Sequence, residues 1–419
     1  MKAILFSIGT RGDIEPFLAI AQLLKERNWE VICVFPEQFR KTVEEMGIAF
    51  EGFTKEFLEL LNGEEAKVFM GGKGSFFKRL MIVIRMSRIG IRLSKEMIAL
   101  QHQIQIKEKP DRIIYHPKCN YAIIWGMANP GKSIMVSPIP GMSHPIHHLT
   151  ALGGNYGSFI NRLSFWLVNT VKAFVIKKVS RRYWKDYGSL KVTMGSIKKA
   201  MLETEKTFYT ISPSLFPRPA YWPASAKVVG YYERNKALNW QPDEALLAFI
   251  NANKKIVLIT FGSMSNPDPA EKSRVITDVL KRNNIAAIIN TSWGGIEKTG
   301  GCPIHIYFTN NIPYDWLFPH LFAVVHHGGS GTTHTAVKYA CPSLVIPHAV
   351  DQFFWAKTIA ALQLGPEAIP IKKLNEVDFE KRLLDLVSNE TYKRRAVEIS
   401  DRMKTESNVD KLYEMIANS

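Results

Sequence analysis

The segment that most constrains the fold is a glycine-rich loop over residues 326–333, which reads HHGGSGTT. The apolar run over 322–325 before it predicts a buried strand, and the helical spacing of Ala336, Val337 and Ala340 predicts a helix after it. Strand, tight loop and helix in this order are typical of a parallel α/β sheet. Small residues let the backbone approach a ligand closely, and a helix N-terminus favours an anion, above all a phosphate.

A second strand, over 343–346, leads to a carboxylate and an amide side by side, Asp351 and Gln352. Each of these side chains can take part in two hydrogen bonds, which suits the hydroxyl groups of a sugar ring. A phosphate-binding loop next to sugar-binding side chains predicts a nucleotide-sugar site.

The N-terminal residues show the same alternation of elements. Residues 2–7 predict a strand, and a glycine loop and a helix over about Glu15 to Arg27 follow, before a second strand over 31–35. The alternation restarts near residue 255, and 419 residues are enough for two domains with separate cores. The sequence therefore predicts an α/β protein with two doubly wound parallel sheets.

Four segments, in order along the chain, resemble the GT-B glycosyltransferases. Residues 322–355 resemble their donor-binding signature, and residues 9–16 (GTRGDIEP) resemble the opening loop of the branch with sterol glucosyltransferases and antibiotic-aglycone glycosyltransferases. Residues 261–264 and 311–317 match further segments of this family, whereas about 52–213 carries no match. The resemblance implies the GT-B architecture, in which two Rossmann-like domains face a central cleft.

The expected domain boundaries follow from this resemblance and from the prolines after residue 212, which predict a linker. We expect an acceptor-binding domain over 1–215 with basic, aromatic helical insertions, and a linker over 216–242. A nucleotide-sugar-binding domain is expected over 243–390. The helices over 391–419 are expected to cross back to the N-terminal domain.

The resemblance also implies a set of donor contacts. His327 and the first turn of the following helix are expected to hold the diphosphate, and Asp351 and Gln352 the sugar. Plant relatives carry a Trp at the Asn311 position and a Glu at the Thr335 position, so the choice between UDP and dTDP stays open. The expected nucleotide-sugar site comprises Thr10, Arg11, Gly12, Ser263, Trp293, Asn311, Ile312, His327, Gly329, Ser330, Gly331, Thr332, Asp351 and Gln352.

Asp13 is the candidate general base, because transfer of a sugar to a hydroxyl requires removal of the acceptor proton. The resemblance places a catalytic Asp or His in this loop. The alternative is an N-cap for the helix expected from Glu15. Arg11 can pair with Asp13 or contact the diphosphate, and pairing would lower the pKa of the base.

We expect no metal and no cofactor other than the donor. The chain has no acidic DxD pair in a suitable place, and backbone N–H groups and hydroxyls can stabilise a leaving diphosphate. The histidines of the segment 144–148 are interpreted as acceptor-loop residues. The four cysteines are scattered, which predicts reduced thiols in a cytoplasmic protein.

The net charge of +16 suits an anionic partner. No nucleic-acid-binding module is visible, which leaves two alternatives: anionic ligands, or an anionic membrane surface met by a cytoplasmic protein at the inner face of the membrane. Basic residues with apolar or aromatic neighbours recur over 85–95 and 162–191. The alternative is that these are solvated helix faces. The longest apolar stretch, 163–176, is interrupted by Asn169 and Lys172 and is expected to be too short to span a bilayer.

Together these features predict an inverting, metal-independent glycosyltransferase. It would move a hexose, glucose by first choice, from a UDP-sugar to a hydroxyl of a lipophilic acceptor such as a sterol, terpenoid, phenol or lipid. Two alternatives stay open: another GT-B enzyme such as a nucleotide-sugar epimerase, and a non-catalytic peripheral membrane protein with a degenerate sugar site.

Overall fold

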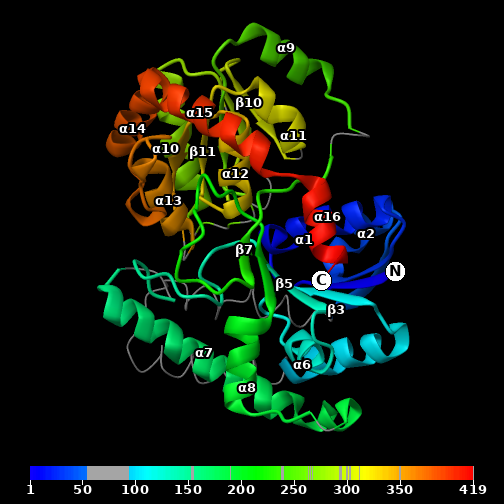
Figure 1. Cartoon of the computed structure of the whole chain (residues 1–419). Coiled ribbons are helices and arrows are strands. Elements are labelled where there is room, and N and C mark those ends of the chain that lie inside the picture. The colour runs from blue at the N-terminus through cyan, green and yellow to red at the C-terminus, as the bar shows by residue number, and fades with distance from the viewer. Residues whose placement is uncertain are drawn as a thin grey trace. The chain divides into compact units, whose positions relative to one another are not determined.

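The chain folds into two compact units, and each is described here by itself (Figure 1). Unit 1 comprises 1–210, 216–234 and 408–419, and unit 2 comprises 211–215 and 235–407. The computed structural model describes residues 1–53, 94–151, 155–188, 190–236, 240–262, 264, 266, 268–291, 295–298, 301, 303–310, 312–348 and 351–418.

Unit 1 is built on a parallel sheet of seven strands in the order β3-β2-β1-β4-β5-β6-β7. The strands are β1 Lys2–Phe6, β2 Glu30–Pro36, β3 Ala49–Phe53, β4 Arg112–Tyr115, β5 Ser133–Ser137, β6 Lys206–Tyr209 and β7 Ala226–Val228. The helices with described bounds are α1 Arg11–Glu26, α2 Arg40–Glu45, α6 Tyr121–Ala128, α7 Ser158–Ser180, α8 Met194–Lys199 and α16 Val409–Ala417.

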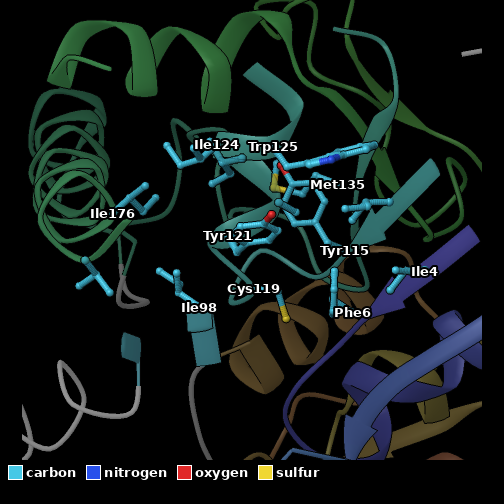
Figure 2. Packing of buried hydrophobic residues seen from close by; sticks show 14 of the residues in the cluster. Ile4, Phe6, Ile98, Tyr115, Cys119, Tyr121, Ile124, Trp125, Met135 and Ile176 are labelled. Atoms are coloured by element: carbon cyan, nitrogen blue, oxygen red, sulfur yellow. The ribbon is translucent and has the colours of Figure 1, made fainter. Parts of the chain in front are cut away.

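Alternation along the strands gives unit 1 two apolar clusters, one on each face of the sheet. Ile4 and Phe6 of β1 belong to one cluster, and Ala3 and Leu5 belong to the other. Figure 2 shows the first cluster, in which side chains of α6 and Ile176 of α7 surround the strand residues. Both faces of the sheet are covered, which explains why its strands are near-continuous apolar runs.

The last helix, α16, completes the second apolar cluster of unit 1. Leu412 and Ile416 are buried there together with residues of α1. Arg112 of β4 holds the helix end, because its Nε donates to the carbonyl oxygen of Ile416 at 3.3 Å and its Nη2 to that of Ala417 at 3.0 Å. A guanidinium at a helix C-terminus satisfies carbonyl groups that have no partner within the helix.

Unit 2 is built on a parallel sheet of five strands in the order β10-β9-β8-β11-β12. The strands are β8 Val257–Thr260, β9 Ala287–Asn290, β10 Ile306–Thr309, β11 Ala323–His326 and β12 Ser343–Val345. The helices are α9 Glu244–Ala252, α10 Pro269–Arg282, α11 Tyr314–Leu317, α12 Ser330–Lys338, α13 Asp351–Ala361, α14 Glu376–Ser388 and α15 Glu390–Glu406.

Each sheet has one place where the strand order reverses. In unit 1 it lies between β1 and β4, and in unit 2 it lies between β8 and β11. Loops leave such neighbouring strands toward opposite faces, so a crevice opens beyond the carboxyl ends of the strands, where α/β proteins bind ligands. Both of these positions carry residues predicted to be functional.

The structure corrects three details of the sequence analysis. The predicted linker 216–242 contains a strand, β7, which pairs with β6. A turn precedes this strand, in which the Pro223 carbonyl oxygen accepts from the Ala226 N–H at 2.9 Å. Helix α1 begins at Arg11, not near Glu15. The helical segment Ser158–Tyr187, which contains the apolar stretch, is long and apolar enough to cross a membrane by length and composition.

Two predictions fall partly outside the described residues. Of the basic stretch 85–95, only the last two residues are described, and Lys95 is exposed there. Of the four cysteines, Cys33, Cys119 and Cys341 are buried and free, and Cys302 lies outside the described part of the chain.

Candidate functional site

The glycine-rich loop of unit 2 connects β11 to α12 beside the reversal of strand order. Gly329 is the N-cap of α12, and its backbone has an extended conformation. The first turn of the helix consists of Ser330, Gly331 and Thr332, all half-buried. The N-cap has no side chain to cover the start of the helix, and a helix N-terminus favours an anionic ligand.

His327 lies between two glycines in this loop. A Cβ on Gly262 would come within 2.9 Å of its Cε1, and a Cβ on Gly329 would come within 2.4 Å of its Nε2. The glycines at 262 and 329 are therefore required by the close approach of the imidazole. Gly262 follows β8 and His327 follows β11, so the ring lies at the crevice of unit 2.

The His327 ring is buried and electrically neutral. Burial, with smaller contributions from His326 and His348, lowers its pKa to about 3. Its Nδ1 has no hydrogen-bond partner among the described residues. An unpaired buried polar atom costs about 1–3 kcal/mol, so a ligand that pairs with this ring would recover that free energy.

The neighbouring His326 has a structural role. Its Nδ1 accepts from the backbone N–H of Gly328 at 3.0 Å, which stabilises the turn into the loop. The two imidazole planes are inclined at 88°, and side chains at successive strand positions point to opposite faces. That His327, and not His326, is the phosphate ligand stays a prediction.

The start of α13 packs directly against the glycine loop. A Cβ on Gly328, whose φ is +87°, would meet the backbone oxygen of Gln352 at 3.0 Å. The fold therefore brings the predicted diphosphate loop and the predicted sugar-binding pair, Asp351 and Gln352, next to each other. The Gln352 side chain also holds the backbone, because its Oε1 accepts from His348 N–H at 2.7 Å.

Four other predicted donor residues have different outcomes. Ser263, Trp293 and Asn311 lie outside the described residues. Ile312 is buried in the apolar core with Leu317, so a contact of this segment with a base would have to use its backbone.

In unit 1, Asp13 occupies the third position of α1 and forms a capping box with Thr10. The Thr10 N–H donates to Asp13 Oδ2 at 2.9 Å, while Thr10 is the N-cap. The alternative role of Asp13 as the N-cap is therefore wrong, because the N-cap lies three residues earlier, at Thr10. The Asp13 carboxylate nevertheless stabilises the start of the helix through the capping box. The other oxygen, Oδ1, is available for a different set of contacts.

Two residues after β4 approach Asp13 from the neighbouring strand. His116 Nε2 lies 3.2 Å from Asp13 Oδ1, and Lys118 Nζ lies 3.1 Å from the same oxygen. The Lys118 N–H donates to His116 Nδ1 at 3.2 Å, so a neutral His116 carries its proton on Nε2, facing the carboxylate. The 3.2 Å contact of Nε2 lacks the alignment of a good hydrogen bond.

These neighbours determine the charge state of Asp13. Burial alone would raise the pKa of the Asp13 carboxyl, but the Lys118 charge and the His116 ring lower it well below its usual range. Burial also lowers the pKa of His116, which is fully enclosed and cannot touch a substrate. A lowered pKa keeps the Asp13 carboxylate ionised at neutral pH, and the Lys118 charge limits its strength as a base.

Sequence reasoning missed both His116 and Lys118. The signal that was present is their place directly after an apolar strand, 112–115, in a parallel sheet. Placing these two residues beside Asp13 from the sequence would have required knowing that this strand, β4, pairs with β1. Of the two alternatives for Arg11, the pairing with Asp13 is not the one observed: Arg11 Nε bonds to Glu15 at 2.9 Å, and Glu15 also pairs with Arg234 at 3.0 Å. A contact of Arg11 with the diphosphate stays a prediction.

No group of three or more His, Cys, Asp or Glu residues suited to a metal ion is present in the described ranges. Among the histidines of the segment 144–148, His144 uses both ring nitrogens in hydrogen bonds: Nδ1 pairs with Tyr209 OH at 2.9 Å and Nε2 with the Leu202 carbonyl oxygen at 3.2 Å. His147 stacks on the ring of Tyr221 with centroids 3.7 Å apart. His144 and His147 therefore pack against aromatic side chains of unit 1, Tyr209 and Tyr221.

Comparisons with known proteins match both units. Residues 3–107 match the glycosyltransferase family 28 N-terminal domain, and residues 276–415 match the C-terminal domain of erythromycin biosynthesis protein CIII-like proteins. A sterol 3-beta-glucosyltransferase of Arabidopsis thaliana is 29% identical over 423 residues, which cover 98% of this chain. The chain spans 66% of the length of that relative.

Solved structures share the fold over the whole chain. The glycotransferase of kitacinnamycin superposes with a TM-score of 0.72 at 15% identity and covers 100% of this chain and 98% of its own. A spinosyn rhamnosyltransferase complexed with thymidine diphosphate superposes with a TM-score of 0.65 at 14% identity, with 100% of both chains covered.

Proposed function

Because this chain belongs to the GT-B glycosyltransferases and is homologous to sterol and antibiotic glycosyltransferases, we propose that it transfers a hexose from a nucleoside diphosphate sugar to a lipophilic alcohol. Our specific proposal is an inverting, metal-independent transfer with UDP-glucose as the donor and a sterol, terpenoid, phenol or lipid as the acceptor.

One observation carries the donor half of this proposal. The imidazole of His327, whose Nδ1 has no partner among the described residues, lies between two glycines at the N-terminus of α12. The same loop packs against the residues that begin α13. An anion beside His327 would meet the helix N–H groups, and a sugar attached to it would lie near Asp351. A diphosphate sugar has its charges and its hydroxyls in this arrangement.

Asp13 supports the acceptor half. In the proposed step the acceptor oxygen forms a bond to the anomeric carbon while the bond from that carbon to the diphosphate oxygen breaks. The acceptor proton passes to Asp13 Oδ1, and the bonding electrons leave with the nucleoside diphosphate. His116 and Lys118 hold the carboxylate in place and keep it ionised before the step.

The leaving diphosphate gains negative charge, and the groups proposed to stabilise it are the His327 ring and the first turn of α12. Ser330 and Thr332 add hydroxyl donors and Gly331 adds a backbone N–H. In this proposal the stabilisation comes from fixed donors of the chain, so no metal ion takes part in the step.

The decisive experiment is a transfer assay with two donors and several acceptors. Purified protein is incubated with UDP-glucose or dTDP-glucose and with a sterol, a phenol, a terpenoid alcohol or a glycolipid. We expect a mass increase of one hexose on at least one acceptor with UDP-glucose, in the β configuration expected for inversion of an α-linked donor.

Three outcomes would contradict parts of the proposal. Transfer with dTDP-glucose alone would correct the donor but keep the reaction. An altered nucleotide sugar formed without any acceptor would identify an epimerase. Binding of UDP-glucose with no product from any acceptor in the panel would favour a non-catalytic sugar-binding protein.

A further inference from the structure

Helix α7 presents two very different sides. One side is tied to unit 1 by three polar side chains that reach backbone carbonyls: Asn161 Nδ2 to His147 at 2.9 Å, Asn169 Nδ2 to Ser143 at 3.0 Å, and Lys172 Nζ to Pro117 at 2.7 Å. The polar residues that interrupt the apolar run of the sequence therefore face inward and anchor the helix.

The other side of α7 is apolar and exposed. Its positions recur every three or four residues, so their side chains share one side of the helix. Phe159 is 79% exposed and Trp166 is 55% exposed, which is unusual for large aromatic side chains of a folded unit. We call this surface the α7 strip, which consists of Phe159, Ile160, Leu163, Trp166, Leu167, Val171 and Phe174.

Basic side chains border the α7 strip. Lys178 is exposed one turn after Phe174, on the same side of the helix. Lys198 Nζ lies 5.0 Å from the centroid of the Trp166 ring and donates to Thr170 Oγ1 at 3.0 Å. Beyond the helix, Arg181, Arg182 and Lys185 are exposed in the 3-10 segment that ends at Tyr187. The only acidic residue over 158–187 is Asp186, and it pairs with His102 at 3.1 Å.

We propose that the α7 strip docks on the surface of an anionic phospholipid bilayer. In this arrangement the strip enters the boundary between headgroups and acyl chains, and the basic residues contact lipid phosphates. Apolar aromatic side chains bordered by lysine and arginine are the composition of helices that lie in a membrane interface. The proposal goes beyond the transfer reaction and does not depend on it.

The helix would lie along the membrane and not cross it. Ser158–Tyr187 has the length and the mean hydropathy of a membrane-spanning helix. A crossing would expose Asn161, Asn169 and Lys172 to acyl chains and break their three bonds to the body of unit 1. An in-plane helix keeps these bonds and still buries the apolar side.

The first test removes the apolar side chains. The full-length triple variant Phe159→Gln, Trp166→Gln, Phe174→Gln is compared with wild type for flotation with vesicles of phosphatidylcholine and phosphatidylglycerol. We expect the partition coefficient to fall at least about tenfold, since three large side chains lose their contact with acyl chains. A matched control, Ile304→Gln, Val377→Gln, Val397→Gln, removes three exposed apolar side chains from unit 2 and should bind like wild type.

The second test removes charge. Arg181→Gln, Arg182→Gln, Lys185→Gln should lower binding to the anionic vesicles about fivefold per charge at low salt, and the difference should shrink as salt is added. The control Lys372→Gln, Lys373→Gln, Lys381→Gln changes three exposed lysines of unit 2 by the same charge. Pure phosphatidylcholine vesicles should bind wild type less than anionic ones.

Several results would overturn the proposal. These are no wild-type binding to anionic vesicles at low salt, equal binding by the apolar triple variant with an unchanged circular dichroism spectrum, or equal loss in the matched control. A wild-type dimer in sedimentation equilibrium that the apolar triple variant converts to a monomer, without vesicle binding, would assign the strip to a second copy of the chain instead.

Discussion

The two crevices of this molecule arise from the same topology but hold opposite chemistry. In each sheet the functional loops follow the two strands at which the strand order reverses, β1 and β4 in unit 1 and β8 and β11 in unit 2. The first crevice holds an ionised carboxylate between a lysine and a histidine. The second holds a neutral histidine, His327, at a helix N-terminus, and its Nδ1 has no partner among the described residues.

The difference indicates which kind of group each crevice is suited to receive. Asp13 already has its charge balanced, so it can accept a proton without attracting a large anion. The crevice of unit 2 holds a neutral imidazole beside a helix N-terminus, which favours an incoming anion. A carboxylate for the proton and donors for the leaving group are the two requirements of sugar transfer from a nucleoside diphosphate.

The largest effect is expected when the carboxylate in the crevice of unit 1 is removed, because transfer should fall while the binding of UDP does not. Asp13→Asn keeps the size of the side chain but cannot take up the proton, so transfer should fall about a hundredfold or more. The affinity for UDP, measured by calorimetry, should be unchanged because His327 and the first turn of α12, which we propose to hold the diphosphate, lie in unit 2. Transfer within a few-fold of wild type would remove Asp13 from the role of base.

The next effect distinguishes two parts of the unit 2 crevice. His327→Ala should weaken the binding of UDP itself about ten- to hundredfold, the scale of a lost hydrogen bond to a charged group. Asp351→Ala should leave the affinity for UDP unchanged but lower the use of UDP-glucose. If both variants bind UDP like wild type, the diphosphate does not lie beside His327.

A smaller effect concerns the pH dependence of the unit 1 crevice. The low pKa of Asp13 predicts no loss of kcat/KM in wild type as the pH falls from 8 to about 5, because the carboxylate stays ionised. Lys118→Met removes a nearby positive charge, so the pKa of Asp13 should rise and an acid limb should enter this range. At pH 8 the variant should transfer within a few-fold of wild type, as Asp13 remains ionised there. Identical pH profiles would show that Lys118 does not control the base.

The smallest expected effect is none at all. If fixed donors of unit 2 stabilise the leaving diphosphate, transfer should be unchanged after exhaustive dialysis against EDTA. The measurement is the initial rate with and without added Mg²⁺, with metal content checked by mass spectrometry. A rate that depends on Mg²⁺ would mean that the fixed donors of unit 2 are not sufficient to stabilise the leaving diphosphate without a metal ion.

Local patterns in the sequence predicted most of the fold. The strands that precede the glycine loops, β1 and β11, lie within one or two residues of expectation. These elements are defined by apolar periodicity and by glycines, which act over short distances along the chain. The strands β6 and β7 were missed because they are short and follow a helical, basic region without a periodic signal of their own.

The candidate site was predictable where its residues are close in sequence and not where they converge from distant strands. The loop over 326–333 contains its own strand, glycines and helix start, so His327 could be singled out. His116 and Lys118 approach Asp13 from more than a hundred residues away along the chain. Their role depends on the pairing of β1 with β4, which no local pattern specifies.

The path of helix α16 determines how such a chain can be recombined with a relative. Residues 235–407 belong to unit 2, yet the twelve residues that follow them finish the apolar core of unit 1. A chimera that takes everything after residue 234 from another protein would keep the foreign unit 2 intact but replace Leu412 and Ile416 in the apolar core of unit 1. A graft with two junctions, near residues 234 and 407, would exchange unit 2, and with it the donor preference that we propose for this unit, while unit 1 retains its native core.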